Sequence, residues 1–400
     1  GLLMAVGCAT LPRRSAPPLS VTAGRPYGLS PTVRPVIDEQ LLKSQAVEIL
    51  RRARAAATDG TFDILALSGG GAGGAFGAGA LVGLSRSGAR PQFEIVTGVS
   101  AGALIAPFAF LGSAWDASLT EALDGARTGN LLERRTLDVL FQPSLYRGKP
   151  LARFVDQIIP DKMIDAVADE AAKGRILLVA TTDLDKQAEV IWNIGTIARE
   201  RDPASKKLFR RVLVASASVP GIFPPVLIHV FGDHTWFDEM HVDGGTTTPF
   251  FIAPEIAQIL PSQFADLAGA HVYVLMNTQV VGSPETSAGR LGPLVARSFS
   301  TILMSMARTE LELASAFARE HSMDLRLTAI PVDYPFGGLI DFTPFTMKAL
   351  FEYGVRCGAS GLLWTTPVDA LQHAEKALAR IAGKTTIGQT APESVPCPAQ

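Results

Sequence analysis

Along most of the chain, short apolar runs that suit β-strands alternate with longer stretches in which apolar residues recur at helical spacing. The segment RILLVATTDL at 175–184 is almost wholly apolar, as expected of a strand buried on both faces. The segment 226–237 has the pattern of a hairpin that turns at Gly232 and Asp233. Further strands are predicted at 62–67, 93–98, 271–277 and 325–332, and helices at 36–58, 80–85, 101–111, 293–321 and 344–363. This alternation predicts an α/β fold with layers around a mainly parallel sheet.

The composition allows a large hydrophobic core and argues against several classes of function. Of the 400 residues, 47% are hydrophobic and 18% charged, which argues against global disorder. The net charge of -2 argues against a nucleic-acid partner and against electrostatic binding to an anionic membrane. Cys8, Cys357 and Cys397 lie far apart without metal-ligand spacing, so neither a zinc site nor a disulfide framework is indicated. Cys357 is interpreted as a small core residue.

Seven glycines fall within the eleven positions 69–79, directly after the strand at 62–67. Glycine costs roughly 0.5–1 kcal/mol in regular structure relative to alanine, so this density requires a reason. One interpretation is an anion-binding loop, because free N–H groups at a helix N-terminus attract negative charge. The other is a dinucleotide fingerprint, since Gly69, Gly71 and Gly74 fit G-x-G-x-x-G. The next strand lacks the acidic end residue that would bind a ribose, so no cofactor is predicted.

The strand at 93–98 runs into GVSAG, in which Gly98 and Gly102 flank Ser100, and an apolar helix follows. A G-x-S-x-G turn between a strand and a helix exposes the serine hydroxyl, because glycine on either side removes clashing side chains. Ser100 is therefore the predicted nucleophile. Its attack on an ester creates an oxyanion, which needs preorganised hydrogen-bond donors. The predicted donors are the backbone N–H groups of Gly69, Gly70, Gly71 and Ala101.

A nucleophilic serine needs a base, and the candidate is Asp243 in the segment MHVDGG. It ends a short predicted strand, and Gly244 and Gly245 let the backbone bend and approach closely. An aspartate in water has a pKa near 3.9, so it must be partly desolvated and held against the serine hydroxyl to accept a proton. The alternative interpretation is a plain Asp-Gly turn.

Taken together, these segments resemble the patatin-like phospholipases, which combine a glycine-rich oxyanion box, a G-x-S-x-G nucleophile and a D-G-[GA] aspartate in this order. The family's A-S-x-x-x-P pattern is matched at residues 215–220. The resemblance covers roughly residues 62–363. It implies a three-layer α/β/α fold, a lipid or acyl-ester substrate, and hydrolysis by a serine–aspartate dyad without histidine. On that pattern Ser100 is the nucleophile and Asp243 the base, with the oxyanion held by the glycine box.

One position departs from the family pattern. The glycine box usually reads G-G-G-x-[RK]-G, and here Gly73 stands at the basic position, which puts a preference for phospholipids in doubt. Arg147 and Lys149 are candidates to supply the missing positive charge. The alternative is that both are solvated charges in a loop. The aliphatic stretches 302–313 and 345–351 are candidates for an acyl groove, or else plain core.

The N-terminus reads as the end of an export segment. Ala5-Val6-Gly7-Cys8 resembles a bacterial lipoprotein box, and six prolines between residues 12 and 35 predict an extended tether. Cys8 is thus a predicted lipidation site and membrane anchor, which predicts the bacterial cell envelope, lipid-anchored or periplasmic. A frayed terminus with an incidental cysteine, in a cytoplasmic protein, is the alternative. The predicted parts are 1–35 (signal end and tether), 36–60 (N-terminal helix), 61–375 (patatin-like hydrolase domain) and 380–400 (loose tail).

Three other interpretations remain open. A serine–histidine–aspartate hydrolase would recruit one of the histidines that follow the aspartate, namely His271, His321 and His373. A metal site would draw on the crowded residues His229, Asp233, His234, Asp238, Glu239 and His241. These residues lack the spacings that place ligands on one face, so no metal is predicted. The third possibility is a lipid-binding lipoprotein on a hydrolase scaffold without activity.

Overall fold

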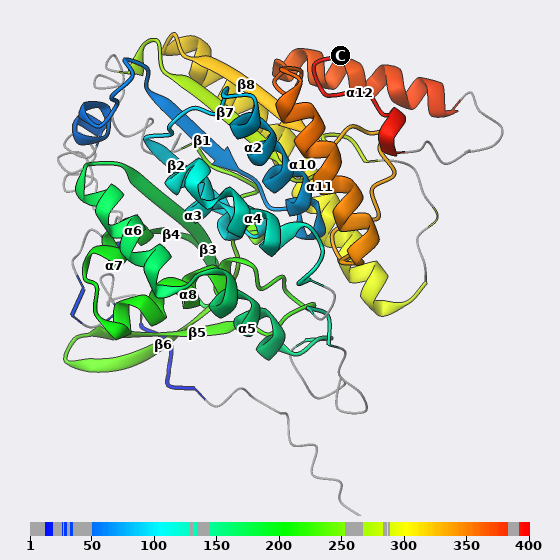
Figure 1. Cartoon of the computed structure of the whole chain (residues 1–400). Coiled ribbons are helices and arrows are strands. Elements are labelled where there is room, and N and C mark those ends of the chain that lie inside the picture. The colour runs from blue at the N-terminus through cyan, green and yellow to red at the C-terminus, as the bar shows by residue number, and fades with distance from the viewer. Residues whose placement is uncertain are drawn as a thin grey trace, which may run out of the picture.

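The computed structural model describes residues 13–18, 26, 28–29, 33–34, 50–128, 131–133, 144–252, 267–282, 286, 289–382 and 392–400. In this part of the chain an eight-stranded sheet forms the centre, with helices on both faces (Figure 1). The strand order is β5-β6-β3-β2-β1-β7-β8, and β4 also pairs with β3. The strands are β1 (Asp63–Leu67), β2 (Ile95–Val99), β3 (Ile176–Asp183), β4 (Ala188–Asn193), β5 (Val226–Gly232), β6 (Thr235–Asp243), β7 (His271–Met276) and β8 (Asp324–Ala329).

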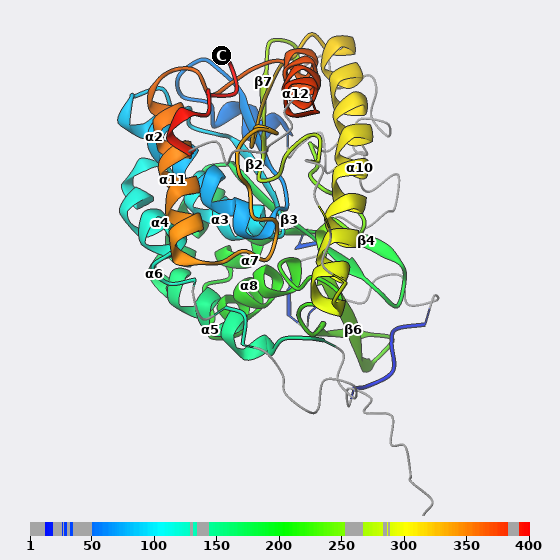
Figure 2. The same ribbon diagram turned by 90° about the vertical axis from the view of Figure 1, so that its right-hand side faces the viewer.

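The helices form two layers, one on each face of the sheet (Figure 2). One layer contains α2 (Gly74–Arg86), α3 (Ala101–Leu111), α4 (Asp116–Leu123), α5 (Gly148–Ile158), α6 (Asp161–Ala172), α7 (Ile194–Arg199), α8 (Pro203–Ser216) and α11 (Pro344–Ala359). The other contains α10 (Leu291–Glu320) and α12 (Pro367–Ala382). Alternate residues of β1 face opposite ways, so Leu65 and Leu67 pack in the first layer and Ile64 and Ala66 in the second. The predicted three-layer α/β/α fold is therefore confirmed.

The sheet is parallel in its centre and antiparallel at one end. Strands β3, β2, β1, β7 and β8 pair in parallel, whereas β4, β5 and β6 pair antiparallel with their neighbours. The predicted hairpin at 226–237 is present as β5 and β6. Its two turn residues are Asp233 and His234, one position later than predicted, with φ of 46° and 59°. Positive φ at both positions is the geometry of a type I′ turn, whose twist matches the flanking strands.

Part of the glycine-rich run serves helix packing. Helices α2 and α11 lie so close that a Cβ on Gly79 would come within 2.0 Å of the Phe351 carbonyl oxygen. From the other side, a Cβ on Gly354 would come within 2.4 Å of the Phe76 carbonyl oxygen. The glycines beyond the loop thus allow backbone contact between two helices, and one of these helices begins at the loop itself.

The C-terminal predictions were wrong at two points. Residues 392–400, expected to be part of a loose tail, pack on α11: the Val395 side chain is 2% exposed, and Arg356 donates to its carbonyl oxygen over 2.8 Å. Cys357 and Cys397 form a disulfide, although no disulfide framework was indicated. Pairing two cysteines 40 residues apart requires the tail to fold back onto the helix, which spacing alone does not reveal.

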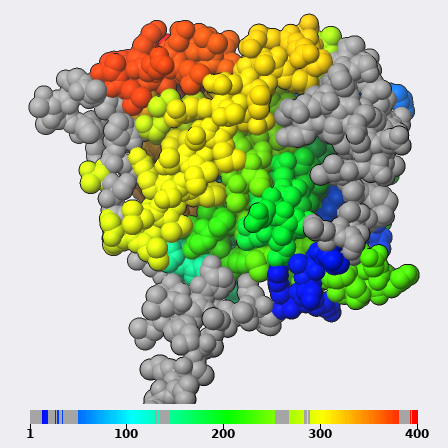
Figure 3. All heavy atoms as spheres, turned by 180° about the vertical axis from the view of Figure 1, so that it is seen from behind, coloured from blue at the N-terminus to red at the C-terminus, as the bar shows by residue number. Residues whose placement is uncertain are grey.

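The N-terminal segment also differs from the expected tether where it is described. Arg13 forms two hydrogen bonds of 2.7 Å with Asp185, and the Ser15 carbonyl oxygen accepts from the Asp238 amide at 3.3 Å. Figure 3 shows these dark-blue residues lying beside the green β5–β6 hairpin. Cys8 and most of the predicted N-terminal helix lie outside the described residues.

No single helix among the described residues is long and apolar enough to cross a membrane. Together, the helical segments 101–111 and 113–123 would be long and apolar enough to do so, but the chain bends by 119° between them. Its first half, α3, is largely buried in the core beside β2.

Candidate functional site

Ser100 occupies the turn between β2 and α3, with φ 55° and ψ −122°. A non-glycine residue in this region of the backbone map is uncommon and strained. The flanking glycines permit the turn: a Cβ on Gly98 would lie 2.7 Å from the Gly102 carbonyl oxygen, and one on Gly102 would lie 2.3 Å from that of Leu67. Close backbone contacts therefore leave no room for a side chain at either glycine of the G-x-S-x-G segment.

Asp243 reaches Ser100 because two strands meet along one edge of β3. On this edge β2 pairs in parallel up to Val99 opposite Ala180, and β6 pairs antiparallel from Asp243 opposite Thr181. The other edge is occupied by β4, which pairs with Ala180 and Thr181 as well. The ends of β2 and β6 are thereby brought to adjacent positions. The Ser100 hydroxyl donates to Oδ2 of Asp243 over 2.5 Å, and the two residues are 143 apart in sequence.

The carboxylate is fixed on both oxygens and shielded from water. Its Oδ1 accepts from the Gly245 amide at 2.7 Å, and Gly244 lies so close to β3 that a Cβ would be 2.5 Å from the Ala180 carbonyl oxygen. Asp243 is 0% exposed and Ser100 5%. Burial raises the pKa of Asp243 to about 7, against the hydrogen bonds from Ser100 and Gly245, which lower it. A carboxylate with this pKa is a far better proton acceptor than an exposed aspartate.

The glycine loop lies against the serine turn, but its amides are not all available. Gly69 is in contact with the nucleophile, since a Cβ on it would lie 3.2 Å from the Ser100 Cβ. Its own amide donates to the Pro249 carbonyl oxygen at 3.1 Å, so the prediction of Gly69 as an oxyanion donor was wrong. Within the described residues, the amides of Gly70, Gly71 and Ala101 have no such acceptor. These three residues line one cavity together with Ser100.

This cavity measures about 60 Å³ and is almost entirely apolar. Its walls come from α3, α5, α10, α11 and the segments between them, and no charged side chain is among the described residues that line it. The aliphatic residues and rings that close it include Leu104, Leu151, Phe154, Phe223, Phe299 and Met347. Of the two predicted groove stretches, 345–351 contributes Met347, whereas 302–313 contributes nothing to the lining.

The missing basic residue of the glycine box has a steric explanation. A Cβ on Gly73 would lie 1.9 Å from the Asn277 carbonyl oxygen, so the position has no room for any side chain. Arg147 is exposed, pairs with Glu133 over 3.6 Å, and does not line the cavity; Lys149 is exposed as well. Neither brings a positive charge to the cavity beside Ser100.

The three histidines of the alternative triad lie elsewhere. His271 begins β7, at the N-terminal end of the parallel strands and so at the opposite end from the serine turn, and its Nδ1 lies 2.8 Å from the Asp63 carboxylate. His321 follows α10 and packs against the Phe317 ring. His373 lies in α12 beside a different cavity. The contacts described for these histidines do not include Ser100 or Asp243.

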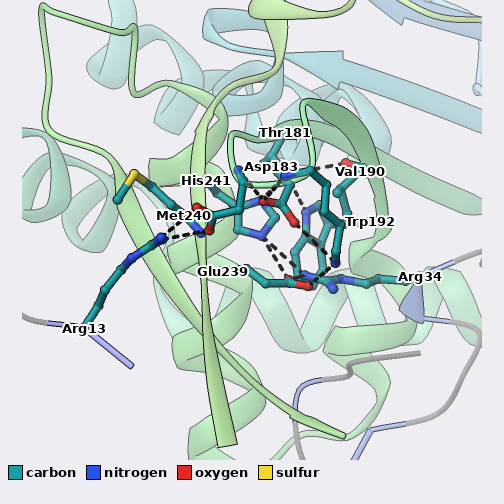
Figure 4. A network of polar contacts seen from close by, with 11 residues as sticks. Arg13, Arg34, Thr181, Asp183, Val190, Trp192, Glu239, Met240 and His241 are labelled. Atoms are coloured by element: carbon teal, nitrogen blue, oxygen red, sulfur yellow. Dashed lines mark hydrogen bonds and ion pairs between the residues drawn. The ribbon is translucent and has the colours of Figure 1, made fainter. Parts of the chain in front are cut away.

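Of the crowded polar residues, Glu239 and His241 form a buried cluster with Asp183 of β3 (Figure 4). Their possible ligand atoms lie within 4.8 Å of one another. Arg34 binds Glu239 over 2.5 Å, and Lys186 lies 2.6 Å from Glu239 and 3.3 Å from Asp183.

These cations balance the two carboxylates of the cluster. Although burial opposes it, the His241 hydrogen bond and the Arg34 guanidinium hold the pKa of the Glu239 carboxyl well below its usual range. Burial lowers the pKa of His241, so the ring is neutral. These contacts fix Arg34 against β6, and Oδ2 of Asp183 has the ion pair with Lys186 but no hydrogen bond.

Comparison with known proteins finds a family model and a solved structure that resemble this chain. Residues 65–254 match the model of a family described as patatin-like phospholipase, a range that includes the serine turn and the aspartate. The crystal structure of VipD from Legionella pneumophila aligns over 78% of this chain and 70% of its own, at 13% identity and a TM-score of 0.35. No curated protein sequence matches the chain.

Proposed function

Because the chain contains a patatin-like phospholipase domain, we propose that it is a serine-dependent lipid acyl hydrolase in which Ser100 and Asp243 form a catalytic dyad. The observation that carries the proposal is the 2.5 Å hydrogen bond from the Ser100 hydroxyl to a buried carboxylate, beside a cavity lined by unengaged backbone amides. The family supports a lipid substrate in general. The dyad, the oxyanion donors and the class of ester are the finer parts of the proposal.

In the proposed mechanism, Ser100 Oγ attacks the acyl carbon while Asp243 Oδ2 takes the hydroxyl proton. The carbonyl oxygen becomes an oxyanion held by the amides of Gly70, Gly71 and Ala101, where one donor is worth roughly 2.7–4 kcal/mol. When the intermediate collapses, the ester bond breaks and the leaving alkoxide takes the proton from Asp243. Water then attacks the acyl-enzyme while Asp243 accepts a proton from it. When the second intermediate collapses, Asp243 returns this proton to Ser100 Oγ and the carboxylic acid leaves.

The cavity indicates how the acyl group is bound. Its apolar walls favour a hydrocarbon chain, because burying each CH₂ stabilises a complex by about 0.8 kcal/mol. At about 60 Å³ it is smaller than a cavity of about 150 Å³ that accepts one benzene molecule. We therefore infer a preference for esters with short acyl chains. The cavity selects the substrate by the length of its acyl chain and not by a charged head group.

A panel of p-nitrophenyl esters from acetate to palmitate tests this proposal. Turnover is expected for all short esters, with the highest kcat/KM between acetate and hexanoate and a fall toward palmitate. Met347→Ala, which enlarges the cavity, should move the optimum to longer chains. Met323→Ala, at a buried methionine between α10 and β8 on the other face of the sheet, should leave it in place. Absence of all ester turnover in folded protein would favour a lipid-binding scaffold.

The pH dependence of turnover follows from the burial of the base. Asp243 must be ionised to accept the serine proton, and its pKa is raised to about 7. The rate should therefore rise as the pH increases from 5, reach half of its maximum near pH 7 and remain level above pH 8. Initial rates with p-nitrophenyl butyrate across this range measure the midpoint. A midpoint near pH 4, typical of an exposed aspartate, would contradict the buried base.

We further propose that Cys8 is lipidated and anchors the protein in the bacterial cell envelope. The disulfide between Cys357 and Cys397 supports this, because disulfides persist in oxidising compartments such as the periplasm. When the protein is expressed with a lipoprotein leader, radiolabelled palmitate should enter the wild type and not Cys8→Ser. The variant should also leave the membrane fraction. Equal labelling of both proteins would contradict the anchor.

A further inference from the structure

We propose that Ser216 is a positioning residue that holds the nucleophile in its strained turn and, together with Ser218, sets the nucleophile's place relative to the base. This inference rests on the proposed function and adds a residue to it. The sequence matched Ser216 to a family pattern without assigning it a role.

The hydroxyl of Ser216 forms a bridge within the core. It accepts a hydrogen bond from the Ser100 amide at 3.0 Å and donates to the Ala180 carbonyl oxygen of β3 at 2.7 Å. Ser216 is 0% exposed and does not line the cavity, so its hydroxyl does not touch a substrate. Its effect on the reaction must therefore pass through Ser100.

The same segment also holds the base. Two residues after Ser216, the Ser218 carbonyl oxygen accepts from the Asp243 amide at 2.9 Å. One short stretch at the end of α8 thus binds the main chain of both proposed dyad members. The β3 carbonyl oxygen that receives the Ser216 hydroxyl is also the atom that the backbone approaches closely at Gly244. The segments that carry the nucleophile and the base are therefore both positioned against the Ala180 carbonyl oxygen of β3.

The strained conformation of Ser100 explains why a hydroxyl is needed at residue 216. A backbone with φ 55° and ψ −122° persists only where its surroundings hold it. Without the Ser216 oxygen the buried Ser100 amide would lose its acceptor, and an unpaired buried N–H is unfavourable. The turn would then relax toward an ordinary conformation and carry the Ser100 Oγ away from Asp243. The bond to Ser216 also means that the Ser100 amide is not an oxyanion donor.

The test compares Ser216→Ala, which deletes the bridge, with Ser216→Thr, which keeps a hydroxyl. The matched control is Ser205→Ala, which removes another buried hydroxyl from α8, one that donates to Asp202 at the far end of the helix. Each protein is titrated to completion with a fluorophosphonate, and kcat and KM for p-nitrophenyl butyrate are expressed per labelled site. This normalisation removes losses caused by unfolding alone.

For Ser216→Ala we expect kcat per labelled site to fall between ten- and a hundred-fold with KM changed less than two-fold. Ser216→Thr should recover most of this loss, and Ser205→Ala should match the wild type. A wild-type kcat per site in Ser216→Ala would overturn the inference, because a residue that serves folding alone lowers only the number of active sites.

A crystal structure of Ser216→Ala gives a readout that does not require turnover. Ser100 should leave the positive-φ region, and its Oγ should move out of hydrogen-bond distance of Asp243. An unchanged turn would overturn the positioning role. If the wild type itself hydrolyses no ester and Ser100 takes no label, the proposed function fails, and the crystal structure still decides whether Ser216 holds the turn.

Discussion

Ser100→Ala is expected to lower kcat/KM for p-nitrophenyl butyrate by about 10³-fold or more. The variant lacks the atom that bonds to the acyl carbon, and only the cavity and the oxyanion amides remain to favour attack by water. The change deletes one buried oxygen, so the fold and the cavity should persist. Initial rates at pH 8 measure the loss, and a fluorophosphonate should label the wild type at residue 100 and leave the variant unlabelled.

The control for this loss is Ser205→Ala, which should retain wild-type rates and labelling. Two results would contradict the assignment of the nucleophile. One is a Ser100→Ala variant that keeps more than a tenth of the wild-type rate. The other is a fluorophosphonate adduct that maps to a different serine in the active protein.

Asp243→Asn is expected to reduce kcat by about 10²–10⁴-fold and at the same time to raise the melting temperature. An asparagine keeps the shape of the side chain, and its oxygen still accepts from the Gly245 amide, but it cannot take the serine proton. The stability gain arises because the wild-type carboxyl is buried and its pKa is raised to about 7 in the folded state. In the unfolded chain an aspartate has a pKa near 3.9.

The sign of the pH effect follows from this difference. A group whose pKa is raised by folding contributes stability below its unfolded pKa, and this contribution is lost as the pH rises through the folded pKa. The melting temperature of Asp243→Asn should therefore exceed that of the wild type by an amount that grows between about pH 4 and pH 7 and then stays constant. Thermal unfolding at pH 4, 6 and 8 measures it. A variant that is less stable than the wild type at pH 8 would show that burial of the carboxylate carries no electrostatic cost.

Replacement of the histidines separates the dyad from the triad alternative, because loss of the aspartate's charge lowers turnover in both. If a histidine were the base, single replacement of His271, His321 or His373 would abolish turnover. We expect each of these three variants to keep its activity, because the contacts described for these histidines do not include the serine or the aspartate.

The buried polar contacts of Ser216 were not recognised as part of the site from sequence. No helix was assigned over 203–216, although Asp202 followed by Pro203 is a helix-start signal, and Asp202 does cap α8 through two backbone amides. Recognition of that helix would have placed Ser216 at its end. It would not have shown which backbone group the hydroxyl contacts.

The sequence by itself determined the central strands, the serine turn with its flanking glycines, and the aspartate followed by two glycines. These features depend on near neighbours in the chain: buried parallel strands are continuously apolar, and a tight turn needs glycine wherever backbone lies against backbone. Only the tertiary structure decided that β2 and β6 meet on one edge of β3, that the Gly69 amide is already engaged, and that the C-terminal segment is bound by a disulfide. Each of these is a contact between segments far apart in the chain. Such contacts depend on strand order and on which hydrogen-bond partners remain after the core has packed, and no local pattern of residues records either.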